Sequence, residues 1–263
     1  MSKKIVAIGG GLNGRLKDDG SYDPYETGPM DEEIIRLTGK SNPNFLFIAH
    51  SQSTEEAQEK YFIAMYNIYS KKYGCECKHL KSKEIFNKEY VNKLIEWADI
   101  IYEGGGNTLD MIALWKEAGF DKVLRTAWEN GKVMCGVSAG ANCWFKECSS
   151  DSLQIKFGKD QPLIEVDCIG LVDGLFVPHC DEPEREKNVK ELLKESSQIG
   201  ISISNCCALE IIDDEYRLIK SIPIAKKIKP YGLKSYWKDG EYVINQIEDD
   251  NNFKDLSDLL SKN

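Results

Sequence analysis

One short glycine-bounded segment has the residue types of a serine nucleophile. Gly136-Val137-Ser138-Ala139-Gly140 follows the apolar stretch 132–137 and precedes a stretch of helical character. This strand–turn–helix setting is what the G-x-S-x-G nucleophile elbow requires, because small flanking residues allow the strained turn that exposes the serine hydroxyl. The N–H of Ala139 then points toward an oxyanion formed at that hydroxyl. The pattern predicts Ser138 as a nucleophile, with a structural turn as the alternative.

A serine nucleophile needs a base, because its hydroxyl is hardly ionised near neutral pH. The chain offers three histidines. His179 ends the apolar run 175–178, which places it at the carboxyl end of a predicted core strand, within reach of Ser138. His50 ends another predicted strand and could line a pocket, whereas His79 lies in a polar strand with surface character. The sequence favours His179 as the base and keeps His50 as the alternative.

The acid that orients the histidine is predicted at Asp151. A helix cap or a solvated loop aspartate is the alternative explanation for this residue. Ser138 and Asp151 are too close in sequence to enclose a βαβ unit of about 30 residues, which separates such residues in an ordinary α/β-hydrolase. The spacing therefore disfavours a generic esterase or lipase.

Two glycine-rich turns follow predicted strands. The turn Gly104-Gly105-Gly106-Asn107-Thr108 precedes a helix and presents free backbone N–H groups above the sheet, unless it is a plain strand–helix turn. Residues 9–14 formally match G-x-G-x-x-G, but a dinucleotide site also needs a helix to begin at that turn. Residues 15–30, rich in glycine and proline, predict a loop instead. We therefore expect a tight turn and keep a nucleotide-dependent enzyme as a lesser hypothesis.

The elements around these residues alternate between short apolar segments and longer helical ones, a pattern typical of parallel βαβ units. After about residue 199, short strands joined by turns indicate an antiparallel extension of the sheet. One domain is expected over 1–263, with a core at about 3–220 and C-terminal strands and a helical or loose tail over 221–263. The expected strands are 4–8, 44–49, 75–80, 99–102, 132–137, 175–178, 201–203, 208–212, 216–220 and 242–247, and the expected helices are 54–73, 88–97, 107–118, 120–130 and one from 139.

Composition limits the partners and the compartment. A net charge of −9 without a basic stripe argues against nucleic acid, and the acidic residues 248–250 argue against an anionic membrane surface. The chain has no apolar run long enough to span a bilayer and no signal-peptide pattern. Nine cysteines, an odd number, fit reduced thiols, so a cytoplasmic protein is expected.

Together these motifs resemble the dipeptidase E and cyanophycinase family of serine peptidases. The resemblance covers about residues 3–220, and the glycine–asparagine turn combined with the serine elbow is more specific than either alone. It implies an α/β fold, a flavodoxin-like three-layer α/β/α sandwich of the class I glutamine amidotransferase-like type. The segments that carry it are Ala7–Gly11, Phe47–Ser51, Glu103–Thr108, Gly136–Ala141, Cys143–Phe145, Ser150–Ser152 and Val177–Asp181.

The resemblance also implies site roles. By position in the family's motifs, Ser138 matches the nucleophile, His179 the base and Asp151 the acid, and the N–H groups of Gly106 and Ala139 match the oxyanion donors. No metal or organic cofactor is expected. The chain departs from the shorter aspartyl dipeptidases by extra sequence at 13–30 and at the C-terminus, which could reshape the substrate pocket.

Members of the family favour Asp-containing substrates, so a dipeptide with N-terminal Asp is the expected substrate. Arg185 is a candidate to hold an acidic side chain through a bidentate pair, unless it is a solvated helix-surface residue, and Asn107 and His50 are further candidate binding residues. The expected partner is a small peptide, with neither nucleic acid nor membrane, and a homodimer is left open. The alternatives are a catalytically inactive binding protein and a cyanophycinase-like β-aspartyl peptidase.

Overall fold

The main sheet of the computed structural model has eight strands in the order β14-β11-β10-β1-β5-β4-β2-β3. The structure describes residues 1–263 except 16, 18, 197 and 226. Five central strands are parallel, and three strands extend the sheet antiparallel beyond β1. The parallel strands are β1 (Lys4–Ile8), β2 (Asn44–Ile48), β3 (Glu76–Leu80), β4 (Ile100–Glu103) and β5 (Val133–Val137), and the antiparallel ones are β10 (Cys207–Ile212), β11 (Glu215–Lys220) and β14 (Lys254–Asp255).

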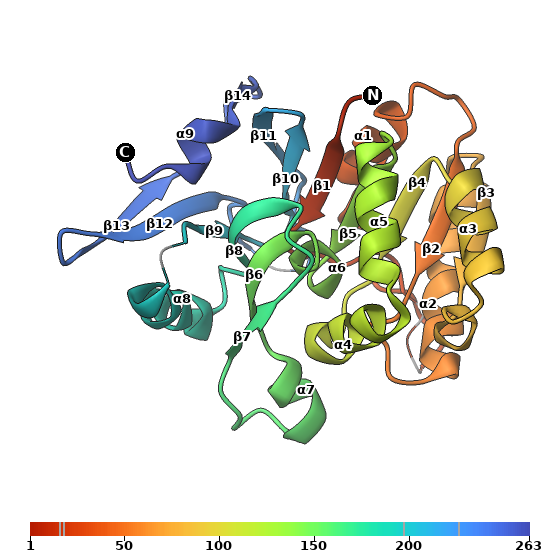
Figure 1. Ribbon diagram of the computed structural model, residues 1–263, viewed down its shortest axis with the longest axis horizontal. Coiled ribbons are helices and arrows are strands. Elements are labelled where there is room, and N and C mark those ends of the chain that lie inside the picture. The colour runs from red at the N-terminus through yellow and green to blue at the C-terminus, as the bar shows by residue number, and fades with distance from the viewer. Residues whose placement is uncertain (16, 18, 197, 226) are drawn as a thin grey trace.

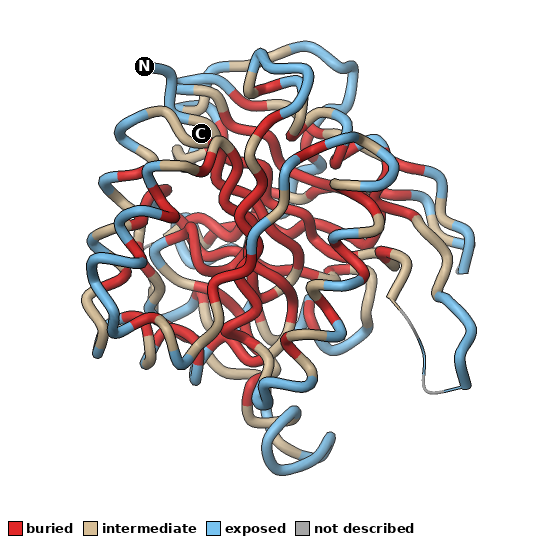
Figure 2. The backbone as a smooth tube through the Cα atoms, turned by 90° about the vertical axis from the view of Figure 1, so that its right-hand side faces the viewer, coloured by how far each residue is buried: buried red, intermediate tan, exposed pale blue. Residues whose placement is uncertain are grey.

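Both faces of this sheet are buried. Side chains alternate between the two faces along each strand, so each strand contributes to two apolar clusters. In β1, Ile5 and Ala7 join one apolar cluster, whereas Val6 and Ile8 join the other. The Val6 face packs on α1 (Gly28–Arg36), α2 (Glu55–Tyr66) and the π-helical segment η1 (Asn67–Lys72). The opposite face packs on α3 (Lys88–Trp97), α4 (Thr108–Ala118) and α5 (Phe120–Glu129). Figures 1 and 2 show this layering and the buried strands in the middle of the molecule.

A second sheet of six strands, in the order β13-β12-β9-β8-β6-β7, completes the molecule. One of its faces adds Phe145, Phe176 and Ile201 to the Ile5 cluster, and its other face packs Leu175 and Val177 on α8. The remaining elements are β6 (Phe145–Ser150), β7 (Ile164–Asp167), β8 (Val172–Pro178), β9 (Gly200–Ile203), β12 (Gly232–Lys238), β13 (Glu241–Gln246), α6 (Ala139–Asn142), α7 (Ser152–Phe157), α8 (Pro183–Glu195), α9 (Leu256–Leu260) and the short 3₁₀ turn η2 (Ser82–Glu84).

The α/β sandwich expected from the sequence is confirmed, but the C-terminal strands divide between two sheets. β10 and β11 extend the main sheet as expected, whereas β9 and β13 join the second sheet. The sequence did not indicate that sheet because β6 is a polar segment, Phe-Lys-Glu-Cys-Ser-Ser, whose last three residues are nevertheless buried. Shortly after His179, the chain forms the helix α8.

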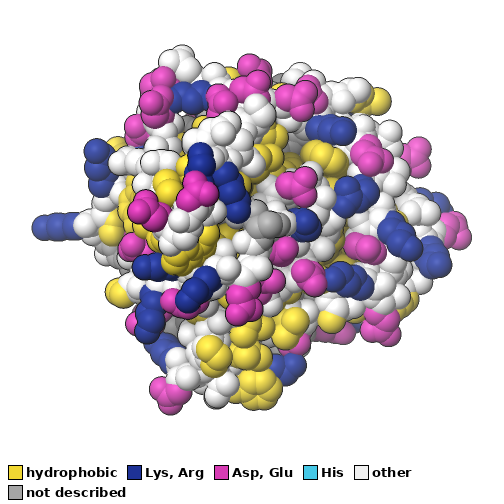
Figure 3. Space-filling model, turned by 60° about the vertical axis from the view of Figure 1, so that its left-hand side comes forward, with side chains coloured by type: hydrophobic (Ala, Val, Ile, Leu, Met, Phe, Trp, Pro, Cys, Tyr) yellow, Lys and Arg dark blue, Asp and Glu magenta, His cyan; other side chains and the backbone are white. Residues whose placement is uncertain are grey.

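The surface mixes charges of both signs. On the face in Figure 3, acidic and basic side chains are interspersed among small apolar patches. In the described part of the chain, no helix is long and apolar enough to cross a bilayer. All nine cysteines are described, and all are free thiols.

Candidate active site

Ser138 lies in a sharp turn between β5 and α6. Its backbone has φ 56° and ψ −114°, a conformation that costs a residue with a Cβ about 1–3 kcal/mol and persists only where the surroundings enforce it. The flanking glycines supply part of that enforcement, because a Cβ on Gly136 or Gly140 would collide with the main-chain oxygen of Glu103 in β4. The Ser138 N–H also donates to Ile8 O at the end of β1, at 3.0 Å. The hydroxyl is thereby fixed at the carboxyl edge of the main sheet.

His179 faces this hydroxyl from the end of β8. Its Nε2 lies 2.9 Å from Ser138 Oγ, so the structure brings together the two residues that the sequence predicted as nucleophile and base. The histidine also has a positive φ of 53°, and its N–H donates to Gly9 O at 3.0 Å. A Cβ on Gly10 would collide with the imidazole. The first glycine-rich turn therefore makes room for the histidine, and the next helix, α1, begins only at Gly28, so the turn is not the start of a dinucleotide-binding helix.

The partner of His179 Nδ1 is Asn205, in the turn between β9 and β10. Asn205 Oδ1 lies 2.9 Å from Nδ1. Its Nδ2 donates to both carboxylate oxygens of Asp181 at 2.9 Å, and its main-chain N–H donates to the same carboxylate at 2.8 Å. Because an ionised carboxylate only accepts hydrogen bonds, Asp181 fixes the amide with Oδ1 toward the imidazole. Nδ1 must then carry the proton, which leaves Nε2 free to accept one from Ser138.

The electrostatic setting keeps this imidazole neutral. Burial lowers the pKa of His179 below its usual value, and the nearby positive charge of Arg185 lowers it further. The hydrogen bond to Asn205 and the charges of Glu182 and Asp151 act in the opposite direction but are smaller. A neutral histidine with a free Nε2 is the form that can remove a proton from a hydroxyl.

Asp151 is not the hydrogen-bond partner of His179, which corrects the arrangement expected from the sequence. Its carboxylate lies 3.0 Å from Arg185 Nη2. Asp151 occupies the N-cap position of α7 without capping it through its side chain. The expectation failed because neither closeness in sequence nor order in the motif determines where the Asp151 side chain points. Helix α8 places Arg185 next to this carboxylate, and the β9–β10 turn places Asn205 next to His179 Nδ1.

Asn205 and Asp181 were missed at the sequence level. Asp181 lies in Val177–Asp181, one of the segments that carry the family resemblance, but the motif predicts no role for it. Asn205 is a polar residue shortly after a buried strand, the position at which functional side chains gather at the carboxyl edge of α/β sheets. That placement was the available signal.

Two backbone N–H groups beside Ser138 point to an oxyanion site. Within the described residues, the N–H groups of Gly106 and Ala139 have no acceptor. The turn that carries Gly106 is held from both sides, since Gln52 Nε2 donates to Gly105 O and Gly105 N–H donates to Tyr61 Oη at 3.3 Å. Gly106 has φ 153°, and a Cβ there would collide with Ser51 O. The two predicted donor groups are thus unpaired and rigidly placed.

The other predicted binding residues have structural contacts instead. Asn107 caps α4 through Oδ1 and donates to Ser152 O. His50 is buried between Leu80 O and the indole N–H of Trp115, and burial lowers its pKa to about 3. Arg185 is 4% exposed and paired with Asp151, so it is neither a solvated residue nor a free cation. His79, expected at the surface, is buried and stacks on Phe62.

A cavity of about 250 Å³ adjoins the imidazole. It is lined by His179, Asn205 and Glu182 and by apolar groups, notably Leu12, Pro223 and Ile228. Glu26 also lines it, but one of its oxygens accepts from Leu12 N–H and the other from the N–H groups of residues 224 and 225. The cavity offers a mainly apolar space beside the group that would protonate a leaving amine.

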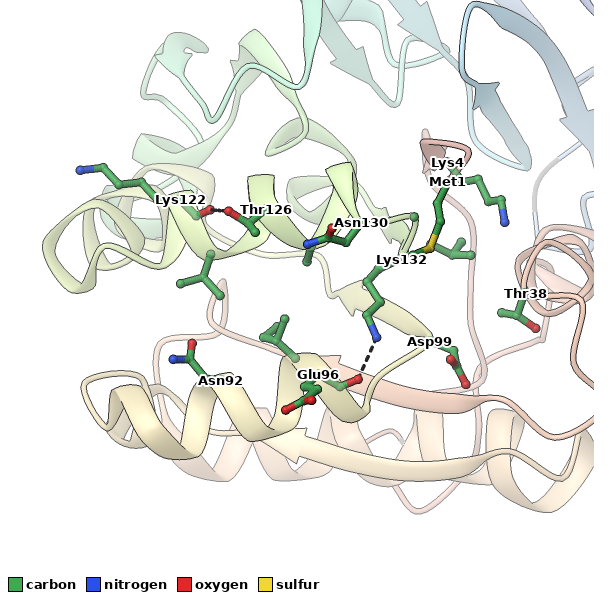
Figure 4. A pocket seen from close by; sticks show the side chains of 15 residues that line it. Met1, Lys4, Thr38, Asn92, Glu96, Asp99, Lys122, Thr126, Asn130 and Lys132 are labelled. Atoms are coloured by element: carbon green, nitrogen blue, oxygen red, sulfur yellow. Dashed lines mark hydrogen bonds between the residues drawn. The ribbon is translucent and has the colours of Figure 1, made fainter.

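A second cavity, of about 750 Å³, lies at the opposite end of the sheet. Lys4, Asp99 and Lys132, which line it, stand at the amino ends of β1, β4 and β5 (Figure 4). Lys4 donates to Leu37 O and Lys132 to Glu96 O, so these cations are already engaged. Neither Ser138 nor His179 lines this cavity, and it is not part of the site.

Among the described residues, one cluster has carboxylates close enough together to hold a cation. Glu147, Glu165 and Asp167 meet on the paired strands β6 and β7. They are exposed or half-buried, and exposed acidic groups of this kind are common without an ion. None of them contacts the Ser138–His179 pair.

Comparisons with known proteins identify the family and the fold. Residues 20–219 match the profile of peptidase family S51. An uncharacterized peptidase of Bacillus subtilis (strain 168), YgaJ, is 32% identical over 216 residues, which covers 81% of this chain and 85% of that protein. The crystal structure of a peptidase from an acI-B1 Actinobacterium has a TM-score of 0.66 at 17% identity, with 97% of each chain covered.

A putative peptidase E from Listeria monocytogenes EGD-e has a TM-score of 0.56 at 21% identity, with 84% of this chain and 99% of that chain covered. At these identities the two solved structures show only the fold, whereas the profile match and the B. subtilis relative show the family. The chain belongs to peptidase family S51 and is a serine-type peptidase.

Proposed function

We propose that this peptidase hydrolyses short peptides, in particular dipeptides with N-terminal Asp, through a Ser138–His179–Asn205 hydrogen-bonded series backed by Asp181. The single observation that carries the proposal is the 2.9 Å contact between Ser138 Oγ and His179 Nε2. It lies beside two backbone N–H groups that have no acceptor among the residues that the structure describes. This proposal replaces Asp151 by Asn205 as the group that orients the base.

In the first half-reaction, Ser138 Oγ attacks the peptide carbonyl carbon while its proton moves to His179 Nε2. The resulting imidazolium donates from Nδ1 to Asn205 Oδ1, and the Asp181 carboxylate behind the amide stabilises that positive charge. The negative charge on the carbonyl oxygen is met by the N–H groups of Gly106 and Ala139. One such donor is typically worth about 3–4 kcal/mol in the transition state.

Collapse of the tetrahedral intermediate breaks the C–N bond, and His179 Nε2 gives its proton to the leaving amine. Water then attacks the acyl-serine with His179 again as the base, and Ser138 is regenerated. The apolar cavity beside His179 is where the leaving residue fits. The family supports a peptide substrate, and the preference for Asp rests on the resemblance to aspartyl dipeptidases.

The test is Ser138→Ala. We expect kcat for an Asp-X dipeptide to fall by at least about 10⁴-fold, because no nucleophile remains. A fluorophosphonate probe should label the parent protein and fail to label the variant. Ser257→Ala, at an exposed position in α9, is the matched control and should keep both activity and labelling.

Two outcomes would reject parts of the proposal. Turnover of dipeptides by Ser138→Ala at the parent rate would exclude Ser138 as the nucleophile. A parent protein that is neither labelled nor active on a panel of dipeptides would favour the inactive, ligand-binding alternative. Preference for β-Asp-Arg over Asp-X in the same panel would favour a cyanophycinase-like activity.

A further inference from the structure

We propose that Arg15 binds the side-chain carboxylate of the substrate residue on the acyl side of the scissile bond, and so determines the preference for an acidic residue there. The inference rests on the proposed function, since it assigns the specificity of the same site. Arg15 precedes the region matched by the family profile, which begins at residue 20. It is therefore an assignment for this chain rather than one transferred from relatives.

Arg15 lies beside the nucleophile. A methyl group built on Gly105 would lie 3.4 Å from Ser138 Cβ and 3.7 Å from Arg15 Nη2. The guanidinium and the serine therefore both lie within contact distance of the Cβ position that Gly105 leaves empty, next to the oxyanion donor Gly106. A carboxylate on an acyl group attached to Ser138 can reach this guanidinium.

Buried polar residues hold the guanidinium in place. It stacks on the ring of Tyr61, with its carbon 3.5 Å from the ring centroid, and its Nε lies 3.3 Å from Asn13 Oδ1. Asn13 Nδ2 donates to Tyr61 Oη at 3.0 Å, and that oxygen also accepts from Gly105 N–H. Asn13 and Tyr61 are only 3% and 2% exposed. The cation is thus preorganised by the same tyrosine that supports the oxyanion turn.

The main chain of the loop fixes Arg15 as well. Its carbonyl oxygen accepts from Asp23 N–H at 2.8 Å, and Asn13 pairs with Tyr25 as an antiparallel bridge. Within the extra sequence at 13–30, which could reshape the pocket, the pairing of Arg15 with Asp23 and of Asn13 with Tyr25 therefore brings one arginine to the site.

The charge of Arg15 has no counterion within the described residues. The carboxylates nearest the catalytic series are engaged elsewhere, Asp151 with Arg185 and Asp181 with Asn205. Burial raises the pKa of Glu103, beneath the turn, which favours its neutral form. Arg15 is partly buried, and its two Nη groups have no hydrogen-bond acceptor among the described residues. Such a guanidinium is suited to a bidentate carboxylate contact.

The position also indicates which part of the substrate is recognised. His179, which protonates the leaving amine, lines the apolar cavity with Leu12 and Ile228, whereas Arg15 adjoins the oxyanion turn. A dipeptide carries a second carboxylate at its C-terminus, but that group belongs to the leaving residue. We therefore assign Arg15 to the acyl-side side chain.

The experiment compares kcat/KM for Asp-Leu, Asn-Leu and Asp-Leu amide in the parent protein, Arg15→Gln and Arg15→Lys. The parent should prefer Asp-Leu to Asn-Leu. Arg15→Gln should lose roughly 10- to 100-fold on both Asp substrates, the range expected for charged hydrogen bonds, and little on Asn-Leu. Arg15→Lys keeps the charge and should retain part of the preference, which guards against a folding defect in the glutamine variant.

Lys17→Gln is the matched control, because Lys17 is an exposed cation of the same loop whose described partner is Asp23. It should leave the Asp-to-Asn ratio unchanged. If the parent cleaves these substrates and Arg15→Gln keeps the parent ratio, the assignment of Arg15 is wrong while the proposed function stands. A loss that disappears with the amide would instead indicate recognition of the C-terminal carboxylate and overturn the assignment. If the parent cleaves none of the peptides and is not labelled at Ser138, the proposed function fails, and this inference fails with it.

Discussion

At the residue scale, the proposed catalysis depends on the direction of one amide. An asparagine in contact with a catalytic histidine can present either oxygen or nitrogen, and only the oxygen selects the tautomer with a free Nε2. In this chain the carboxylate of Asp181 determines the orientation of the Asn205 amide, because it accepts hydrogen bonds from both the main chain and the side chain of Asn205. In the proposed mechanism Asp181 is a positioning residue, since it acts on the imidazole through Asn205.

Asp181→Asn tests this positioning role. The new amide can donate as well as accept, so Asn205 is free to turn its Nδ2 toward His179 and place the imidazole proton on Nε2. We expect kcat to fall by about 10²-fold or more, the usual contribution of a positioned base. The ¹⁵N chemical shifts of the His179 ring should show the change of tautomer.

A purely structural role for Asp181 predicts a different result. In that case Asp181→Asn would lower the melting temperature while the ring nitrogens of His179 kept their parent shifts. Unchanged kcat with unchanged ring shifts would likewise reject the role. Asp173→Asn, on an exposed position of β8, provides the control for loss of a carboxylate close in sequence.

At the element scale, α1 is attached to the main sheet through a buried carboxyl. Asp31 accepts hydrogen bonds from the hydroxyls of Thr27, Tyr25 and Tyr69, the last of which lies in η1 and stacks on Phe45 of β2. Burial raises the pKa of Asp31 to about 6. The sequence predicted a regular helix over 54–73; in the structure α2 ends at Tyr66 and continues as the π-helical η1, which presents Tyr69 to this carboxyl.

Asp31→Asn tests the cost of this burial. A carboxyl whose folded pKa lies above its unfolded value of about 3.8 makes the folded state less stable as pH rises from about 4 to about 6, by about 3 kcal/mol in total. Asparagine cannot ionise, so the variant should lack this decline. Denaturant unfolding at several pH values should show that the free energy of unfolding of the variant increases relative to that of the parent protein across that interval.

The control is Asp19→Asn. Asp19 is exposed, and the hydrogen bonds from Ser21 lower its pKa, so its removal should produce no gain over the same interval. A parallel pH dependence for the parent protein and Asp31→Asn would mean that Asp31 ionises as freely in the folded protein as in the unfolded one.

How far the sequence predicts these elements depends on which forces place them. The central strands and helices α3, α4 and α5 follow from hydrophobic periodicity, and their observed bounds agree with the expected ones within a residue or two. Ser138 and His179 follow from the ends of such strands. The contacts of Asp151 and Arg15 cannot be predicted in this way, because they depend on how α8 and the loop 13–30 pack in three dimensions. The strand β6 was missed because tertiary packing buries its polar side chains, and no hydrophobic pattern in the sequence indicates that burial.

At the scale of the whole molecule, the C-terminal tail joins the two sheets. β14 pairs with β11 of the main sheet, while Lys234 of β12 in the second sheet donates to Asp258 O in α9. Leu259 is 1% exposed and belongs to the large apolar cluster between the layers. The sequence allowed a loose tail; the structure has it packed.

Leu259→Ala should therefore reduce the free energy of unfolding by about 2–3 kcal/mol, the lower part of the range for large-to-small changes in cores. Ile222→Ala, at a position 84% exposed, should change it by less than about 0.5 kcal/mol. Urea unfolding of both variants at one pH measures the difference. Equal values for the two would show that the tail contributes no core packing.

The central place of β1 affects when the enzyme can first act. Gly9 and Gly10, which lie far before Asn205 in the chain, contact His179 and the Asn205 turn, and β1 pairs with β10, which follows that turn. Since proteins are synthesised from the N-terminus, Ser138 and His179 leave the ribosome while Asn205 is still inside it or not yet joined to the chain. The imidazole of a growing chain therefore has no fixed tautomer, and Asn205 must emerge before His179 can serve as the base for an attack by Ser138 on a neighbouring nascent peptide.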